Sequence, residues 1–307
     1  MAGAQMILNR MNRFMDTDII DIRKHTIEKI LDKQDAEFRW GFDAKQARER
    51  PAYVYYSPNF KSTLWTLILF ADIKAPADIP QVKPSLQLIT QRFYDPKHGI
   101  FRLPGMSHFP IPCLNGNMIY LHQYFEASQS EMLDKTIGFF ASYQRFDDGG
   151  FKTPRSYPYC SNISCYGNHT CYWGVTKLLK GLSFIPKLQR TKEAKQLIEN
   201  CIEFVLHHEV CFRSHQRDEF LHREIGKLTF PNFYKSDFLE ILWLLAREDV
   251  YDRRMSRALG LLRSKMKNGG VWELEKSLNI VVSIGPKERT NAFITERAIE
   301  VLDYYGR

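Results

Sequence analysis

The chain has 307 residues, and 44% of them are hydrophobic and 25% charged. This composition is that of a folded globular protein and excludes a disordered chain, a collagen and a coiled coil. Uninterrupted apolar runs, such as residues 67–71, are far shorter than the roughly 18 residues that a membrane span needs, and no apolar stretch followed by a cleavage site marks a signal peptide. We therefore expect a cytoplasmic protein without a transmembrane segment.

The charge balance is basic, since 43 Lys and Arg residues against 35 Asp and Glu residues give a net charge of +8. Such an excess permits an anionic ligand, which could be a diphosphate, a nucleic acid or a membrane surface. The basic residues are scattered along the chain and form no dense tract or nucleic-acid motif. Nucleic acid is therefore not expected as a partner, and a solvated basic surface explains most of these residues.

Nearly every long segment has helical periodicity, and no convincing alternating strand is present. Residues 1–50 mix basic and apolar side chains and are predicted to form a helical segment that caps a domain over residues 51–307; docking on a membrane or on a partner is the alternative. Later helices are indicated by apolar faces and by potential N-caps at Ser236, Asp252 and Thr290. The sequence predicts an all-α protein with one structural domain.

A helix that ends in a glycine turn followed by an aromatic residue occurs three times along the chain. Glycine supplies the positive φ that ends a helix, and the aromatic residue fills the seam with the neighbouring hairpin. Helical hairpins repeated in this way must bury their inner faces on one another, as a curved solenoid or a closed ring. The three turns are Gly99-Ile-Phe101, Asp147-Asp-Gly-Gly-Phe151 and Gly269-Gly-Val-Trp272.

These residues resemble a known superfamily. The stretch Gln144-Arg-Phe-Asp-Asp-Gly-Gly-Phe151 is similar to the repeat of squalene cyclases and protein prenyltransferases, whose members form α/α toroids. The run Asn168-His-Thr-Cys-Tyr172 resembles the segment of protein farnesyltransferase β subunits in which a histidine binds catalytic zinc. The resemblance covers about residues 60–305 and is closest to single-domain prokaryotic proteins described only as squalene-cyclase-like or prenyltransferase-like. It implies an α/α toroid of repeated helical hairpins.

The stretch from Cys160 to Cys171 holds three cysteines and a histidine and is the candidate metal site. Cys165 and His169 are four residues apart, which places them on one face if that turn is helical, and thiolate with imidazole is zinc-type ligation. The resemblance adds Cys113, which aligns with the family's zinc cysteine, although Ile111 stands where the family has an aspartate. It thus implies zinc bound by Cys113, Cys165 and His169, with Cys160 as a replacement for Cys165. Buried structural thiols and a histidine bonded to a carbonyl are the alternative.

The resemblance also implies a cavity whose aromatic walls bind an isoprenoid, because aromatic faces suit an apolar chain and can stabilise a carbocation. Aromatic residues that merely fill the ring are the alternative. The side chains expected to face the cavity are Tyr120, Tyr166, Tyr172 and Trp173, and the candidates for a diphosphate are Arg102 and Arg155, which follow the repeat turns.

A histidine-rich stretch follows, with His207 and His208 adjacent and His215 and His222 beyond them. Adjacent residues of a helix point about 100° apart, so His207 and His208 are not expected to face one ion together. This stretch is therefore predicted to be a polar rim and not a second metal site.

Two hypotheses for the function remain. Cyclisation is disfavoured, because the sequence lacks both the Asp-x-Asp-Asp run that protonates an alkene and the Asp-Asp-x-x-Asp/Glu run of metal-dependent terpene synthases. In the first hypothesis, a zinc-dependent prenyltransferase-like enzyme transfers an isoprenyl group from an allylic diphosphate to a thiol or another nucleophile, with or without a partner subunit. In the second, a non-catalytic toroid binds a lipid, an isoprenoid or a peptide in its central cavity.

Overall fold

The computed structural model describes residues 19–49, 54–56, 60–103, 110–127, 130–150, 152–161 and 163–306. Over these ranges the chain is helical apart from one short antiparallel hairpin, which confirms the all-α fold class. None of the helices in these ranges has the length and apolar character that crossing a membrane requires. After a first helix at residues 19–31, the elements are α2 (Ala44–Glu49), α3 (Thr63–Asp72), α4 (Val82–Phe93), β1 (Tyr94–Asp95), β2 (Ile100–Phe101), α5 (Pro112–Phe125), α6 (Glu131–Tyr143), η1 (Tyr159–Ser161), α7 (Ile163–Tyr166), α8 (Tyr172–Ser183), η2 (Lys187–Gln189), α9 (Lys192–His207), α10 (Phe238–Arg247), η3 (Arg253–Met255), α11 (Ser256–Ser264) and α12 (Ala292–Tyr305).

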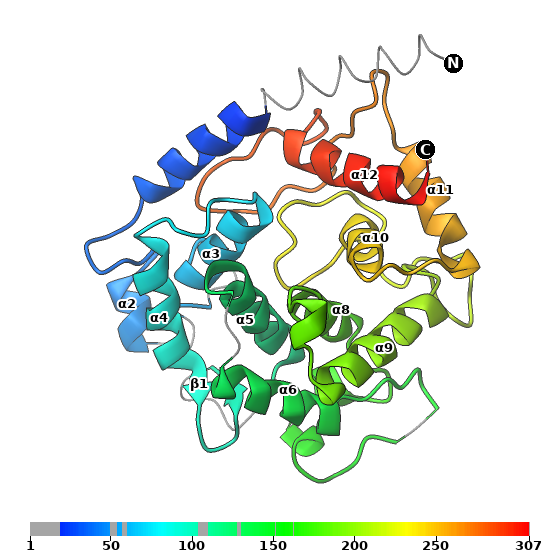
Figure 1. The fold of residues 1–307 in the computed structure, drawn as a ribbon, viewed down its shortest axis with the longest axis horizontal. Coiled ribbons are helices and arrows are strands. Elements are labelled where there is room, and N and C mark those ends of the chain that lie inside the picture. Colours follow the sequence, from blue (N-terminus) through cyan, green and yellow to red (C-terminus); the bar gives the residue numbers. More distant parts are fainter. Residues whose placement is uncertain are drawn as a thin grey trace.

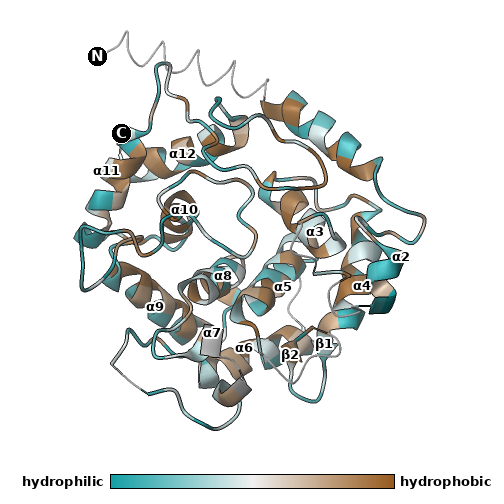
Figure 2. Ribbon diagram, turned by 180° about the vertical axis from the view of Figure 1, so that it is seen from behind, coloured by the Kyte–Doolittle hydropathy of each residue, from teal (hydrophilic) through white to brown (hydrophobic). Residues whose placement is uncertain are grey.

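The helices form two concentric layers (Figure 1). In the described part of the chain, α3, α5, α8, α10 and α12 make the inner layer, and α4, α6, α9 and α11 lie outside them. Figure 2 shows hydrophobic residues concentrated on the inner helices α3 and α10 and hydrophilic residues on the outer α2. Every residue of α3 and nearly every residue of α10 is buried, as expected for helices covered on all sides. The arrangement is the α/α toroid of helical hairpins that the sequence predicted.

The inner helices run parallel, because hydrogen bonds join like ends of neighbouring helices. Near the helix starts, the Trp173 indole of α8 donates to the Ser236 carbonyl, which directly precedes α10, at 3.2 Å. Near the helix ends, the Tyr124 hydroxyl of α5 donates to the Ala75 carbonyl beyond α3 at 2.8 Å, and the Trp243 indole of α10 donates to Glu300 of α12 at 2.9 Å. All the inner helices therefore begin on one side of the ring, which we call the N-terminal rim.

The ring closes where its first and last inner helices meet. Lys74, just after α3, pairs with Glu296 of α12 at 3.2 Å and also with Glu300. The first helix covers this junction, since the Arg23 guanidinium donates to the Ile73 carbonyl at 2.6 Å and pairs with Glu296 at 2.8 Å. Residues 1–18 of the N-terminal segment expected from the sequence lie outside the described residues.

Glycine allows α5 and α8 to approach more closely than the other inner helices. A Cβ atom on Gly116 would lie 2.2 Å from the Lys177 carbonyl oxygen, and one on Gly181 would lie 2.4 Å from the Gly116 carbonyl oxygen. Neither helix could carry a larger residue at these positions without moving away from the other. This contact fixes the starts of both helices, which carry Cys113 and Cys171, in one place on the N-terminal rim.

The predicted glycine turns are present, and two predicted caps are displaced by one residue. Gly99, Gly149 and Gly269 all have positive φ. The N-caps of α10 and α12 are Asp237 and Asn291 and not the preceding Ser236 and Thr290. The side chains of Asp237 and Asn291 are longer than those of Ser236 and Thr290. Each accepts hydrogen bonds from two backbone N–H groups, and these bonds make Asp237 and Asn291 the N-cap residues.

Candidate functional site

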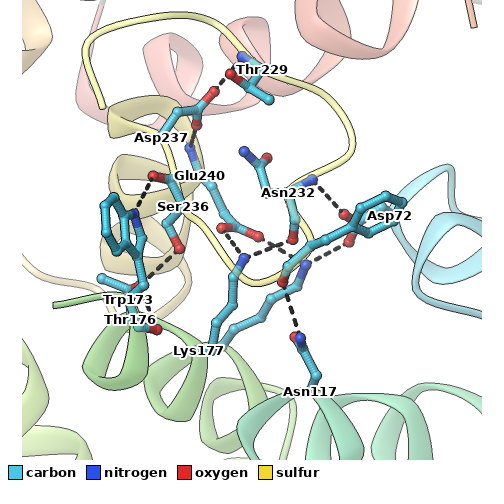
Figure 3. Close-up of polar contacts among 12 residues, drawn as sticks. Asp72, Asn117, Trp173, Thr176, Lys177, Thr229, Asn232, Ser236, Asp237 and Glu240 are labelled. Atoms are coloured by element: carbon cyan, nitrogen blue, oxygen red, sulfur yellow. Dashed lines mark hydrogen bonds and ion pairs between the residues drawn. The ribbon is translucent and has the colours of Figure 1, made fainter. Parts of the chain in front are cut away.

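The centre of the ring is filled by charged side chains (Figure 3). The Lys180 ammonium pairs with Asp72 of α3 at 2.6 Å and with Glu240 of α10 at 2.8 Å. Lys177 pairs with the other Glu240 oxygen. All four side chains are fully buried. We call the set Asp72, Lys177, Lys180, Glu240 and Arg297 the central charge network.

Burial and the neighbouring charges shift the pKa values of this network in opposite senses. Burial lowers the pKa of Lys177 to about 8, and the attraction of Glu240 only partly offsets it. Burial alone would raise the pKa of Glu240, but the positive charges of Lys177 and Lys180 outweigh burial and lower it. Glu240 is therefore ionised at neutral pH, and it is the anion that keeps both lysines inside the ring.

The segment between α9 and α10 enters the ring from the N-terminal rim and covers the network. The backbone carbonyl of Asn232 accepts from Lys177 at 2.7 Å, and its N–H donates to Asp72 at 3.2 Å. The Asn232 side-chain oxygen accepts from Arg297 at 2.8 Å. Tyr120, expected to face a cavity, instead donates its hydroxyl to Asp72 at 3.1 Å and is buried. At the level of these residues the centre of the ring is packed.

A small pocket of about 80 Å³ opens above this plug, at the N-terminal rim. Phe60 stacks on Phe233 and Tyr234, with ring centroids 5.2 and 5.9 Å apart. The Lys235 ammonium lies 4.8 Å from the centre of the Trp173 ring, over its face. We call this the rim pocket; it is lined by Phe60, Trp173, Glu224, Ile225, Thr229, Phe233, Tyr234, Lys235, Ser236, Asp237, Lys276 and Leu278.

Three thiols lie beside the rim pocket. Cys113 starts α5, Cys165 lies on the short α7, and Cys171 is the N-cap residue of α8. A hydrogen bond from the Cys165 thiol, together with backbone N–H groups at the start of α8, lowers the pKa of Cys171 despite burial. Burial, with a smaller contribution from the nearby Cys171, raises the pKa of Cys113 to about 12. We call Cys113, Cys165 and Cys171 the cysteine trio.

Aromatic contacts connect the cysteine trio to the pocket. The Tyr56 hydroxyl hydrogen-bonds the Cys113 thiol. The Tyr56 ring packs against Trp65 at 4.9 Å between centroids, and Trp65 lies 6.3 Å from Tyr234, which lines the pocket. Cys113 is near enough to contribute to the raised pKa of Tyr234, whose main cause is burial. The thiols and the aromatic wall therefore belong to one region of the rim.

The third expected zinc ligand lies elsewhere. The His169 ring is 67% exposed, and its Nδ1 atom lies 3.2 Å from the Asp148 carboxylate. The structure thus brings Cys113 and Cys165 together with Cys171, and it places His169 with Asp148. As the side chains stand, no group of three or more His, Cys, Asp or Glu residues within the described ranges is placed to hold a metal ion.

The remaining candidates are dispersed, and only Trp173 lines the rim pocket. Tyr166 and Tyr172 are buried, and their hydroxyls donate to the carbonyls of Pro110 and Val210. Arg102 pairs with Asp95 at 2.8 Å within the first repeat turn. Arg155 and Cys160 are exposed.

Sequence reasoning missed the central charge network. Its signal is a single acidic residue inside an otherwise apolar helix: Asp72 ends α3, and Glu240 lies among the apolar residues of α10. A charge at such a position requires a buried partner. Which residues provide the partners depends on contacts between side chains at least 60 residues apart in the chain, and no spacing rule gives them.

Comparison with known proteins finds similarity only among solved structures. No family model matches the chain. No curated protein matches it either. Among solved structures, the chain is similar to a substituted form of the type II terpene cyclase MstE from Scytonema in complex with geranylgeranyl dihydroxybenzoate. The two share 11% identity over 93% of this chain and 96% of that one, with a TM-score of 0.38. The function is therefore argued from this chain's own residues.

Proposed function

We propose that this protein binds an isoprenyl diphosphate, or a lipid with a similar anionic head and apolar chain, in the rim pocket. The observation that carries the proposal is the make-up of that pocket, in which aromatic faces lie beside the ammonium groups of Lys235 and Lys276. The rings would contact the apolar chain, and the ammonium groups would contact the head. The inner helices begin at this rim, and the positive ends of their dipoles also favour an anion there.

We further propose a prenyltransferase-like reaction in which the bound isoprenyl group passes to a thiol. The C–O bond to the diphosphate breaks, the diphosphate leaves with the bonding electrons, and a C–S bond forms with a thiolate whose proton has passed to water. Zinc belongs to this proposal, because the cysteine trio supplies the soft donors that zinc prefers. Cys113, Cys165 and Cys171 would hold it, with Cys171 in the role that the sequence suggested for His169, and zinc would lower the pKa of the incoming thiol.

Binding without transfer is the second candidate, and the packed centre of the ring favours it. Asn232 and the central charge network occupy the space in which a long chain would otherwise lie. An apolar chain would then rest at the rim, on Phe233, Tyr234 and Trp173. A partner protein could take the ligand from there, as a partner subunit could supply the thiol in the transferase.

The binding proposal is tested by titrating farnesyl diphosphate into the protein and following tryptophan fluorescence, which reports on Trp173. Farnesol and inorganic diphosphate are titrated separately as the two halves of the ligand. Lys235→Gln should weaken farnesyl diphosphate about tenfold, or roughly 1.4 kcal/mol, and leave farnesol unchanged. Lys45→Gln, on the outer α2, is the matched control. No binding by the unsubstituted protein, or equal effects of the two substitutions, would overturn the proposal.

Transfer is tested separately by incubating the zinc-supplemented protein with farnesyl diphosphate and a cysteine peptide. Mass spectrometry should detect the farnesyl thioether, and Cys171→Ser should abolish it while farnesyl diphosphate still binds. Binding without any thioether would exclude the transferase and support the second candidate.

A further inference from the structure

A second group of metal-ligating side chains lies outside the rim pocket, around the carboxylate of Asp148. The nearest, His169, comes from the segment before α8, at 3.2 Å from one Asp148 oxygen. Two more come from the end of α9 and one from the loop after it. Their Nε2 atoms lie 3.3 Å (His207), 4.0 Å (His208) and 3.6 Å (His215) from an Asp148 oxygen. We call these five residues the Asp148 cluster.

The backbone holds Asp148 and His169 opposite each other. The two residues form an antiparallel bridge, in which the Gly149 N–H donates to the Asn168 carbonyl at 3.0 Å and the Thr170 N–H to the Asp147 carbonyl at 2.8 Å. Gly149 has a φ of +92°, and a Cβ atom there would lie 2.8 Å from the His169 ring. The glycine of the repeat turn therefore leaves the space that the imidazole occupies.

The end of α9 places the next two histidines. His207 is the last residue of the helix and His208 is its C-cap, with φ −90° and ψ 16°. Both imidazoles lie near the Asp148 carboxylate, with Nε2 atoms 3.3 and 4.0 Å from it, whereas the sequence did not lead us to expect two adjacent histidines to face one ion together.

The cluster is open to ions in solution. All of its members except His207 line a surface pocket of about 390 Å³, which shares no lining residue with the rim pocket. The side chains of His207 and His215 are 54% and 77% exposed, whereas His208 is 6% exposed and forms the floor.

The spacing of the donor atoms suits a metal ion. Two bonds of about 2.0 Å at a tetrahedral angle place their donor atoms roughly 3.3 Å apart. The separations of 3.2, 3.3 and 3.6 Å between the Asp148 oxygens and three imidazole nitrogens are close to this value. Imidazole nitrogens with one carboxylate oxygen are typical ligands of zinc and related divalent transition metals.

We propose that the Asp148 cluster binds one divalent transition-metal ion, with zinc as the ion best suited to its donors. The donors do not enclose a common point as they stand, so binding closes the site by turning the exposed rings of His207 and His215. The ion would join the turn at 147–149, the segment before α8 and the loop after α9. This site takes no part in the proposed binding of an isoprenyl diphosphate.

The test uses the full chain carrying Cys113→Ser/Cys165→Ser/Cys171→Ser, so that the cysteine trio binds no zinc, stripped with a chelator and then titrated with zinc against a chromophoric chelator. His207→Ala/His215→Ala changes two exposed side chains and should lower zinc affinity at least 100-fold. His25→Ala, an exposed histidine of the first helix, is the matched control and should bind as the chain with all its histidines does. Far-UV circular dichroism checks that each variant is folded. Unchanged zinc affinity in the double histidine variant, or no binding by the chain with all its histidines, would overturn the proposal.

Cobalt distinguishes this site from the cysteine trio. Co²⁺ bound by imidazole and carboxylate gives visible d–d bands without the intense near-ultraviolet band of a thiolate ligand. Cys113→Ser/Cys165→Ser/Cys171→Ser should leave these visible bands unchanged, and the double histidine variant should lose them. A cobalt spectrum that shows only a thiolate band and disappears in the triple cysteine variant would overturn the proposal. Neither result depends on whether farnesyl diphosphate binds.

Discussion

Replacing Glu240 by glutamine should test whether the central charge network holds the ring together. The substitution keeps the size of the side chain and removes the anion that pairs with both Lys177 and Lys180. Lys180 keeps Asp72 as a partner, but Lys177 is left with the Asn232 carbonyl alone. Breaking a buried ion pair by removing one partner costs about 3–5 kcal/mol.

Lys177 can escape its unpaired charge by losing its proton. Because burial already lowers the pKa of Lys177 to about 8, deprotonation at pH 7 costs only about 1.4 kcal/mol at 1.36 kcal/mol for each pH unit, which favours the lower end of the range. The free energy of unfolding should therefore fall by about 3 kcal/mol in urea titrations followed by far-UV circular dichroism at pH 7.

A double variant separates the charge from the packing. Lys177→Met/Glu240→Leu replaces the pair with apolar side chains of similar size and should recover most of the stability that Glu240→Gln loses, because an apolar pair avoids the cost of burying charge. A Glu240→Gln protein within about 1 kcal/mol of the unsubstituted chain, or a double variant no more stable than it, would refute the reasoning.

Three further predictions concern packing, thiol reactivity and pH. Gly116→Ala should lower the melting temperature sharply, because its methyl group would lie 2.2 Å from a carbonyl oxygen, whereas Gly138→Ala, with nothing within 4 Å, should leave the melting temperature equal or higher. Cys171, with its lowered pKa, should react with iodoacetamide at neutral pH before Cys201, whose pKa burial raises; peptide mass spectrometry measures the order, and equal labelling would contradict it. The lysines hold the pKa of Glu240 below its ordinary 4.5, so its stabilisation should be complete above that pH and lost as pH falls through the lowered value. Melting curves from about pH 3 to 6 should therefore fall less steeply for Glu240→Gln, and identical slopes would contradict this.

The fold could be predicted because its signals are local. The turn that follows each repeat helix contains a glycine with positive φ (Gly99, Gly149 and Gly269), although each helix itself ends several residues earlier. The aromatic residues after two of these turns, Phe101 and Trp272, are buried, as the repeat requires. The apolar faces of the repeated helices must be buried on one another, and only a ring or a curved solenoid of hairpins does this.

The candidate site could be predicted only in part, because it depends on contacts between distant segments. The resemblance placed Cys113 with His169 and offered Cys165 or Cys160 as the further ligand, whereas the structure places Cys113 and Cys165 near Cys171. The antiparallel backbone bridge between Asp148 and His169 places the His169 ring beside the Asp148 carboxylate. The spacing between His169 and the cysteines does not reveal this pairing. The plug at Asn232 likewise depends on a loop that enters the ring from outside it.

The most direct measurement of the central proposal is to locate the bound isoprenyl chain. A photoreactive farnesyl diphosphate analogue carrying a benzophenone on its chain is bound to the full protein, irradiated and mapped by mass spectrometry. We expect labels on peptides that contain Trp173 and residues 229–236, at the rim pocket, and competition by unlabelled farnesyl diphosphate. Competed labels confined to the opposite end of the ring, around Ile79 and Phe125, would contradict the account.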